Sequence, residues 1–527
     1  MENLVNIVNG IIWSPALVYL CLGAGLFYSI MTRFVQVRLF GEMIRLLFKG
    51  KSSEDGISSF QALAVSLAGR VGMGNIAGVA AAIGFGGPGA VFWMWVVAFL
   101  GASTAYVEST LAQIYKEKDA VTGQYRGGPA YYFERALNQR WYGVVFAIAS
   151  ILACGMFLPG VQANGVINAV TQVMGEGNPM NILGIDVGAI RLSALVAILV
   201  ILGIIIFGGI KRIATFTEFV VPFMAIGYIA LALIIMFTNF ERIPEVFGLI
   251  IGDAFTAQAG FGAAIGWGVK RGIYSNEAGQ GTGPHAAGAA EVEHPAQQGL
   301  VQAFSVYVDT LLVCSATAFM ILTMGTYNIQ CFAANKCTTA ADGSFIIQNV
   351  ATATEINSPA FTQMAMQSVY GGFGNIFIAL AVFFFAFTTI LAYYYIAEVN
   401  VSYLTRFISR NANRTGLFLV KVLIMAMVAY GGLNSAGYIW TIGDIGVGLM
   451  AWLNIVGILV IFFVARPTLT MLKDYERQRK AGVAHYDFDP AKFGIKNAPY
   501  WEERHLKRQQ ALRDAEIGSQ SLDKELK

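Results

Sequence analysis

Eleven apolar runs, each long enough to cross the hydrocarbon core of a bilayer, constrain this chain more than any other feature of its sequence. Composition agrees, because 56% of the 527 residues are hydrophobic and only 13% are charged, against about 25% charged in an ordinary soluble domain. The sequence therefore predicts an all-α polytopic membrane protein. The approximate limits of the predicted spans are 14–32, 58–84, 88–115, 142–171, 190–209, 216–238, 258–283, 299–326, 372–400, 415–432 and 436–465.

The second of these runs is interrupted by the stretch GRVGMGNIAGVA, residues 69–80. Glycine costs about 1 kcal/mol at an interior helix position, and non-helical backbone at membrane depth survives only inside protein or beside a water-filled cavity. Arg70 and Asn75 lie in the same stretch, and ionisable groups at this depth are usually functional. The stretch predicts a broken helix with a substrate and ion site, although close packing against a neighbouring helix is the alternative reading of its glycines.

A second stretch, AQAGFGAAIGWGVKRGIYSNEAGQGTGP at residues 257–284, interrupts the seventh run in the same way. Ten of the runs therefore divide into two sets of five, each opening with a broken helix. An odd number of spans per set makes the two openings cross in opposite directions, as in an inverted repeat. The predicted parts are an extra N-terminal helix with an interfacial helix (1–57), two five-helix repeats (58–238 and 258–465) and a charged tail (466–527).

Lysine and arginine are unevenly divided between the two sets of loops. By the positive-inside rule, the N-terminus is predicted outside the cell and the tail in the cytoplasm of a multi-pass inner-membrane protein. The 327–371 loop would then be external, so that Cys331 and Cys337 could form a disulfide. The formal net charge of +3 favours no polyanionic partner, and no nucleic acid is expected. The lysines and arginines of the basic loops lie within residues 33–51, 116–140, 211–212 and 406–414. The loops of the opposite side contain only Arg191, Arg242 and Lys336.

Two long strings carry a family resemblance. GGPGAVFWMWVVAFLG (86–101) and RGIYSNEAGQGTGPHAAGAAEVEHPAQQG (271–299) closely resemble the alanine or glycine:cation symporter family, and the likeness spans residues 14–465. The resemblance implies the leucine-transporter fold with one extra helix and sodium-coupled import of a small neutral amino acid. VGMGN (71–75) and GFGAAI (260–265) are similar to the broken helices 1 and 6 of the wider sodium symporter group.

The resemblance also implies where sodium would bind. The family fold places hydroxyl ligands at Thr388 and Thr389, together with the carbonyls near Ala68 and Val71. Sodium prefers such hard oxygen ligands. The alternative is that both threonine hydroxyls bond carbonyls of their own helix. A second sodium near Asn75 has a suitable amide ligand, but no carboxylate is evident in the sequence to assist it.

For the amino acid, the resemblance implies that backbone amides from Gly72 to Gly74 hold the carboxylate and carbonyls from Gly260 to Gly262 hold the ammonium. Gln162 is similar in position to a polar pocket residue of the family, and Phe261 and Tyr393 would limit the side-chain space, although a membrane phenylalanine is usually a packing residue. The implied substrate contacts are Gly72, Met73, Gly74, Asn75, Gln162, Gly260, Phe261, Gly262, Thr389 and Tyr393.

Several charged residues at membrane depth need partners. They are gate salt bridges or static anchors, and the sequence favours neither. The cations are Arg70, Lys270 and Arg271, and the carboxylates available to pair with them are Glu108, Glu277, Asp309, Glu398 and Asp444. The spacing of His285 and His294 matches no common metal site, and no nucleophilic triad is present, so the chain is not expected to be an enzyme.

Sodium is thus the expected coupling ion, with no organic cofactor, and alanine or glycine the expected substrate. Proton-coupled carriage or exchange is the alternative within transport, and a non-transporting amino-acid sensor is the alternative outside it. Serine, glutamine and D-amino acids are not separated from alanine by the sequence.

Overall fold

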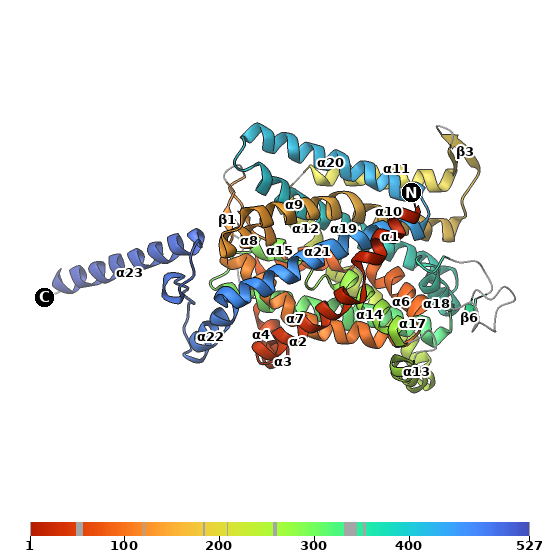
Figure 1. The fold of residues 1–527 in the computed structure, drawn as a ribbon, viewed down its shortest axis with the longest axis horizontal. Coiled ribbons are helices and arrows are strands. Elements are labelled where there is room, and N and C mark those ends of the chain that lie inside the picture. Colours follow the sequence, from red (N-terminus) through yellow and green to blue (C-terminus); the bar gives the residue numbers. More distant parts are fainter. Residues whose placement is uncertain are drawn as a thin grey trace.

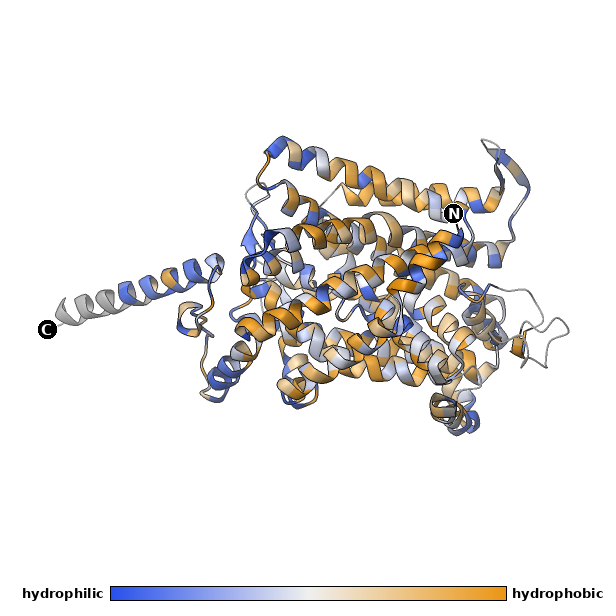
Figure 2. Ribbon diagram, in the orientation of Figure 1, coloured by the Kyte–Doolittle hydropathy of each residue, from blue (hydrophilic) through white to orange (hydrophobic). Residues whose placement is uncertain are grey.

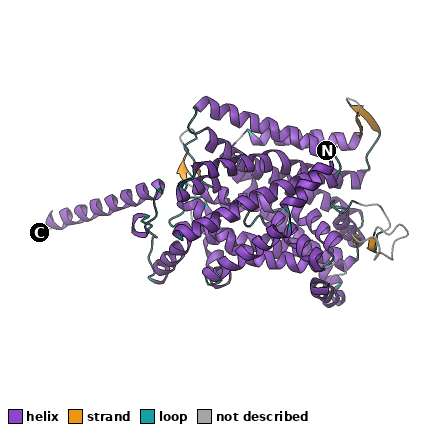
Figure 3. Cartoon of the chain, viewed as in Figure 1, coloured by secondary structure: helices purple, strands orange, loops and turns teal. Residues whose placement is uncertain are grey.

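The computed structural model describes residues 2–48, 56–119, 122–182, 185–207, 209–256, 261–330, 345–350 and 355–525. Long helices make up almost all of it, and three two-stranded hairpins lie at its ends (Figure 3). Each hairpin is antiparallel, with Glu117 opposite Arg126, Pro179 opposite Gly188 and Asn328 opposite Gln348. The strands are β1 (Glu117–Lys118), β2 (Tyr125–Arg126), β3 (Pro179–Ile182), β4 (Ile185–Gly188), β5 (Asn328–Gln330) and β6 (Phe345–Gln348).

The helices of the first half begin with the extra N-terminal span and reach the middle of the chain. The short pair α3 and α4 follows the span at the segment predicted to be interfacial. These elements are α1 (Glu2–Ile12), α2 (Pro15–Met31), α3 (Val35–Arg38), α4 (Phe40–Leu47), α5 (Ser59–Arg70), η1 (Gly74–Gly78), α6 (Val79–Gly86), α7 (Gly89–Ile114), α8 (Pro129–Leu137), α9 (Arg140–Leu152), η2 (Ala153–Phe157), α10 (Leu158–Met174), α11 (Ala189–Ile206), α12 (Gly209–Thr238), η3 (Phe240–Arg242) and α13 (Ile243–Thr256).

The second half opens with another broken helix, α14 and α15, and closes with the tail helices. Its elements are α14 (Phe261–Asn276), α15 (Gly283–Ala289), α16 (Pro295–Val306), η4 (Tyr307–Cys314), α17 (Ser315–Met324), α18 (Ala360–Tyr370), α19 (Gly372–Thr405), α20 (Arg410–Leu433), α21 (Ala436–Ala465), α22 (Pro467–Lys480), η5 (Ala491–Phe493) and α23 (Pro499–Glu525).

Ten of the eleven predicted spans are found as membrane-length apolar helices. Within the described residues, nine helices qualify by length and composition, and α5 with the 74–86 helix makes a tenth that bends by 53°. The predicted span 258–283 is instead the 16-residue α14 followed by a loop and the short α15. The division into repeats stays a prediction.

The side of the bundle is apolar and its ends are polar (Figure 2). On the outward surfaces of α11, α12 and α20, large apolar side chains such as Phe219, Phe237 and Phe418 are more than half exposed. A water-soluble protein rarely leaves apolar patches of this extent uncovered. These surfaces therefore suit contact with lipid.

The two ends of the bundle differ in what they carry (Figure 1). The N-terminus and the β3–β4 hairpin lie at one end, which we call the hairpin face. The β1–β2 hairpin and the C-terminal helices lie at the other end, which we call the tail face. The two termini thus lie at opposite ends of the bundle (Figure 1).

The start of the tail is packed onto the tail face. Trp501 is 1% exposed and its indole Nε1–H donates to the carbonyl of Gln113 at 2.6 Å. Phe488 and Ala498 are also buried. The charged tail thus carries aromatic residues that are buried against the bundle, which its charge count does not reveal.

Candidate substrate and ion site

The first broken helix is interrupted at Val71–Met73, between α5 and η1. Ser58 and Gln61 form a capping box at the start of α5. In a continuous helix the Gly72 and Asn75 amides would bond the carbonyls of Ala68 and Val71. Here the Gly72 N–H donates to Asn75 Oδ1 at 2.9 Å, and the Asn75 N–H donates to the Gly72 carbonyl at 3.2 Å. The interruption therefore releases the Ala68 and Val71 carbonyls from the helix.

Thr389, buried on α19, meets these released carbonyls. Its Oγ1 lies 2.7 Å from Ala68 O, 3.4 Å from Val71 O and 2.8 Å from Phe385 O. Thr388 donates to the same Phe385 carbonyl at 3.0 Å. One hydroxyl has one proton, so these oxygens outnumber the protons available to them. A cluster of hard oxygens with an excess of lone pairs fits a sodium ion.

The four residues predicted to hold sodium thus lie together, and the Phe385 carbonyl joins them. Both hydroxyls also satisfy the alternative expectation, since Thr388 and Thr389 each bond the Phe385 carbonyl of their own helix. Phe385 could have been found from its position, because a threonine hydroxyl in a helix commonly bonds the carbonyl three or four residues earlier.

Gln162 of α10 lies on the other side of the interruption. Its Oε1 accepts the Met73 N–H at 3.0 Å. A Cβ placed on Gly72 would lie 2.9 Å from this Oε1 and 2.5 Å from Thr389 Oγ1. Only glycine fits between the two side chains. Tyr393, buried one turn after Thr389 on α19, lies on the same helix as the oxygen cluster.

Asn75 contacts a carboxylate that sequence reasoning missed. Its Nδ2 donates to Asp309 Oδ1 at 2.6 Å, and the Ser275 hydroxyl donates to Asp309 Oδ2 at 2.9 Å. Thr310 Oγ1 adds a third contact to the same carboxylate at 2.7 Å. Asp309, which the sequence offered only as a possible partner of a buried cation, therefore lies beside Asn75. Nothing in the spacing of Asn75 and Asp309, 234 residues apart, could have revealed it.

The second broken helix is interrupted at Glu277–Thr282, between α14 and α15. Glu277, Gly279 and Gly281 adopt positive φ values of 57°, 88° and 81°. This break lies beside the first, because a Cβ on Gly69 would contact the Glu277 carboxylate and one on Gly74 would contact Ser275.

The structure does not bring Gly262 to this cluster. Gly262 is exposed near the start of α14, and the neighbouring Ala263 carbonyl lies against Gly86 at the far end of α6. Thirteen residues of helix, about 20 Å at 1.5 Å per residue, separate Gly262 from Ser275. Gly260 lies outside the described residues, as do Cys331 and Cys337, and of Phe261 only the backbone is described.

The buried charges form separate groups. Asp444 on α21 pairs with Arg271 at 2.8 Å and with Lys270 at 2.7 Å, while Glu398 pairs with Arg126 at 2.9 Å. Glu108 accepts hydrogen bonds from the Gly279 and Gly281 amides and from Asn454 Nδ2 at 3.3, 3.2 and 2.7 Å. These contacts tie α7 and α21 to the second break.

Arg70 is the exception among these charges. Its Nη1 donates to the Gln302 carbonyl at 3.3 Å, but in the described part of the chain its Nε and Nη2 have no hydrogen-bond partner. Glu277 Oε1 is likewise unsatisfied among the described residues. The predicted partners of Lys270 and Arg271 are thus resolved, whereas Arg70 lies near carboxylates without a hydrogen bond to one.

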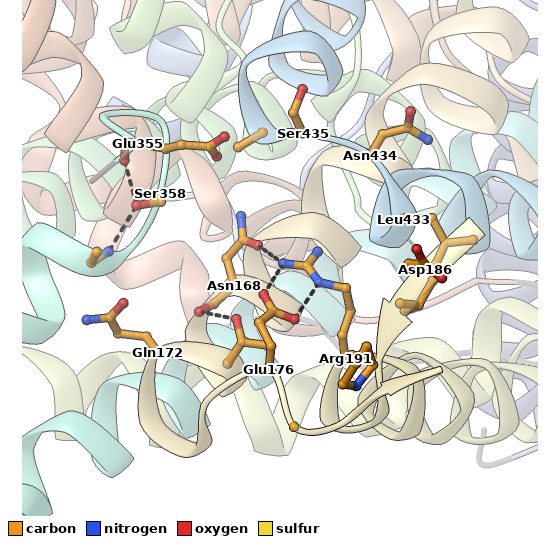
Figure 4. Close-up of a pocket in the computed structure, with 17 residues that line it drawn as sticks. Asn168, Gln172, Glu176, Asp186, Arg191, Glu355, Ser358, Leu433, Asn434 and Ser435 are labelled. Atoms are coloured by element: carbon orange, nitrogen blue, oxygen red, sulfur yellow. Dashed lines mark hydrogen bonds and ion pairs between the residues drawn. The ribbon is translucent and has the colours of Figure 1, made fainter. Parts of the chain in front are cut away.

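A pocket of about 670 Å³ opens on the hairpin face (Figure 4). Arg191 pairs there with Glu176 at 2.8 Å and contacts Asn168 Oδ1 at 3.2 Å. Asn168 follows Gln162 by six residues on α10, about 9 Å along the helix. The pocket therefore lies above the Gln162 side of the broken helix, where a ligand from the hairpin face would arrive.

Comparison with known proteins finds that this chain is similar to sodium-coupled amino-acid transporters. The profile of the sodium:alanine symporter family matches residues 1–489. The chain is 52% identical to the putative sodium/proton-dependent alanine carrier protein YrbD of Bacillus subtilis, covering 96% of this chain and 98% of that one. It is 38% identical to the probable sodium/glutamine symporter GlnT of the same organism, covering 92% of each chain.

A third relative is archaeal. The chain is 35% identical to the sodium/alanine symporter AgcS of Methanococcus maripaludis, covering 87% of this chain and 94% of that one. Among solved structures, MhsT in complex with L-phenylalanine superposes with a TM-score of 0.52 at 12% identity, covering 80% of this chain and 99% of that one. This likeness concerns the fold alone, and it confirms the predicted leucine-transporter fold.

Proposed function

This chain belongs to the sodium:alanine symporter family, and we propose that it carries a small neutral amino acid, alanine or glycine, into the cell together with sodium. The observation that carries the proposal is the first broken helix, whose released Ala68 and Val71 carbonyls face the Thr389 hydroxyl. Relatives at 52% and 47% identity are named as sodium/proton-dependent alanine carriers. The family and its named relatives are transporters, and we propose no enzymatic activity.

Sodium would bind among the oxygens of Ala68, Val71, Phe385, Thr388 and Thr389. Every one of these residues is buried, so the ion would exchange its water shell for protein oxygens. A sodium ion would take the place of the backbone N–H donors that the Ala68 and Val71 carbonyls lose where the helix is interrupted. No organic cofactor is needed for this chemistry.

The amino-acid carboxylate would bind at the amides of Gly72 to Gly74. Two of these amides are held by neutral amide oxygens, those of Asn75 and Gln162. A carboxylate competes well with them, because hydrogen bonds to an ionised acceptor are roughly twice as strong as neutral ones. Gln162 and Asn75 would then turn toward the ligand, and Met73 and Tyr393 would border it.

For the ammonium group the geometry favours the second break over the predicted Gly260–Gly262 carbonyls. The stretch Glu277–Thr282 begins beside Gly69 and interrupts the helix, so that its carbonyls leave the regular hydrogen-bond pattern of a helix. Those of Glu277 and Gly279 accept from the Gln280 N–H and from Asn454 Nδ2. A zwitterion could thus bridge the two breaks, which would move relative to each other during alternating access.

The driving force is sufficient with a single sodium ion. One charge crossing 100 mV gains about 2.3 kcal/mol, and a tenfold sodium gradient adds about 1.4 kcal/mol. Together these about 3.7 kcal/mol support an amino-acid gradient of about 500-fold.

Proton coupling is the second candidate, and the carboxylates near Arg70 favour it. Glu108, Glu277 and Asp309 are all buried at membrane depth around a single guanidinium. Burying unpaired charge is costly, so cations or protons are expected to neutralise part of this group. Asp309→Asn would abolish any proton-driven component while sparing sodium-driven uptake if Asp309 carries the proton.

We also propose the orientation that the basic loops predict, with the N-terminus outside the cell and the tail in the cytoplasm of a multi-pass inner-membrane protein. The opposite placement of the termini (Figure 1) is consistent with it. In this orientation the pocket at Arg191 faces the cell exterior and would admit the substrate.

The test is uptake of labelled alanine into proteoliposomes, with an inward sodium gradient or with choline in its place at fixed pH. Accumulation above equilibrium in sodium alone supports the symporter, and competition by glycine, serine and glutamine then defines the substrate. Accumulation driven only by a proton gradient would favour the second candidate. Failure of both gradients with every amino acid tested would favour a non-transporting sensor.

A further inference from the structure

The C-terminal segment covers the tail face, where α5 begins and α15 ends. Trp501, buried against the bundle, donates its indole N–H to the Gln113 carbonyl at the end of α7. Phe488 packs against the same ring, with centroids 5.2 Å apart. The tail is therefore anchored in the bundle by a large aromatic side chain.

Trp501 also helps to enclose a lysine of the bundle. Lys116 is fully buried, and its Nζ lies 4.4 Å from the ring centroid of Tyr125, 4.3 Å from that of Tyr500 and 5.6 Å from that of Trp501. The same Nζ donates to the Ala290 carbonyl at 2.8 Å. The contacts with Tyr500 and Trp501 require the tail in place, so Lys116 links the docked tail to the loop that contains Ala290.

That loop, residues 290–294, is also held directly by the tail. Arg504 Nη1 donates to the Val292 carbonyl at 2.6 Å and pairs with Glu291 at 3.0 Å. The Tyr486 amide donates to Glu293 at 3.1 Å. Three consecutive loop residues are thus bound by two separate parts of the tail.

The 290–294 loop ties together the tail-face halves of both broken helices. It begins where α15 ends, after Ala289. The Ile57 N–H donates to the Ala289 carbonyl at 3.1 Å, and the Glu291 N–H donates to the Ile57 carbonyl at 2.8 Å. Ile57 immediately precedes the capping box of α5, so α5 and α15 cannot separate without disturbing this loop.

Between α5, α15 and α19 lies a cavity of about 10 Å³, bordered by Gly69, Glu277, Gly283, Ala286 and Ala392. This space holds about one water molecule and is far too small for an amino acid. A path from the site to the tail face therefore requires α5 or α15 to move away from α19.

From these contacts we infer that segment 467–508 is a latch, which keeps the tail-face path closed while docked on the 290–294 loop and must loosen for the path to open. The inference rests on the alternating access of the proposed function. It adds a regulatory element outside the transport site, since none of the latch contacts involves the residues proposed to bind sodium or the amino acid.

The first experiment measures access to the cavity, which needs neither sodium nor substrate. A cysteine introduced by Ala286→Cys reports on the cavity wall through its rate of reaction with a water-soluble maleimide. Adding Trp501→Ala should raise that rate at least fivefold. Adding Lys507→Ala, which removes a 75% exposed side chain from the same helix, should change it less than twofold. Equal rates in the two variants would overturn the latch.

The second experiment fastens the latch instead of loosening it. A cleavable bis-maleimide would join Glu291→Cys to Tyr500→Cys, residues whose wild-type side chains contact each other at 3.3 Å. Cross-linking should reduce uptake at least tenfold relative to the same variant before cross-linking, and cleavage should restore it. Each variant that carries only one of the two introduced cysteines should respond neither to the cross-linker nor to its cleavage. Full uptake by the cross-linked protein would overturn the latch even if Trp501→Ala did not fold. A protein without sodium-driven uptake would refute the proposed function, and the labelling rates would still decide the latch.

Discussion

Replacing Thr389 by valine tests the sodium site most directly, because valine keeps the shape of threonine and removes only the hydroxyl. The Thr389 hydroxyl lies 2.7 Å from Ala68 O, whose helical partner is lost at the interruption. Leaving a buried carbonyl unsatisfied costs about 1–3 kcal/mol, and the ion loses a ligand as well. We expect the sodium concentration for half-maximal uptake to rise about 5- to 150-fold, since 1.4 kcal/mol is a factor of ten.

The assay is alanine uptake into proteoliposomes as a function of sodium concentration at fixed pH and membrane potential. Thr389→Ser restores the hydroxyl and should recover most of the affinity. Thr388→Val should have a smaller effect, because that hydroxyl bonds only the Phe385 carbonyl of its own helix.

Thr441→Val is the matched control. Thr441 is also a threonine in a membrane-length helix, and its hydroxyl bonds the Gly437 carbonyl four residues earlier. It should leave the sodium dependence within twofold of the wild type. If Thr389→Val folds normally and its sodium dependence matches that of Thr441→Val, the oxygen cluster is not the sodium site.

Three further predictions address other parts of the molecule. Gln162→Ala removes the side-chain amide proposed to turn toward the ligand and leaves the buried Met73 N–H without its acceptor. It should weaken amino-acid binding about 5- to 150-fold and lower stability by about 1–3 kcal/mol while the protein still folds; unchanged affinity in competition assays would remove Gln162 from the site. Asp444→Ala strands the buried charges of Lys270 and Arg271 and should cost about 3–5 kcal/mol of stability, whereas Asp444→Glu should cost less, as thermal unfolding would show. Burial lowers the pKa of Lys116 from 10.5 to about 7. Between pH 7 and 10.5 the unfolded chain therefore binds one proton more than the native protein, so the free energy of unfolding should rise with pH by up to about 1.4 kcal/mol per unit. Melting curves from pH 6.5 to 9 should show this rise, and Lys116→Met should flatten it.

Much of the fold followed from local signals in the sequence. Long apolar runs predict membrane helices because the bilayer leaves few other options for the backbone. The glycines at 69–78 located the first interruption for the same reason. These signals are local, so they needed no knowledge of which helices touch.

The second interruption shows where such signals stop. Residues 257–284 contain two groups of glycines, and the GFG group was taken as the break, whereas the helix is interrupted at Glu277–Thr282. Composition cannot distinguish the groups, because the choice depends on which one lies beside the first break. Gly74 contacts Ser275 across 201 positions of the chain, and that juxtaposition exists only in the folded bundle.

The contacts of Asp309 and Trp501 were hidden for a related reason. Asp309 reads as one of several carboxylates in an apolar run, and only its approach to Asn75 distinguishes it. Trp501 stands in a charged segment, where its neighbours predict a solvated helix, yet its ring is buried. Sequence patterns report the average environment of a segment and miss one side chain that departs from it.

The interruption at Val71–Met73 has a thermodynamic consequence for the protein at rest. Carbonyls that lack amide partners can be satisfied by a bound cation instead. A sodium ion bound at the Ala68 and Val71 carbonyls would therefore stabilise the backbone around the interruption. Ligand that binds only the native state stabilises it by RT ln(1 + [L]/Kd), about 2.7 kcal/mol at a hundredfold excess over Kd. Amides around α5 and η1 should therefore exchange with deuterium faster when sodium is replaced by choline, before any amino acid is added.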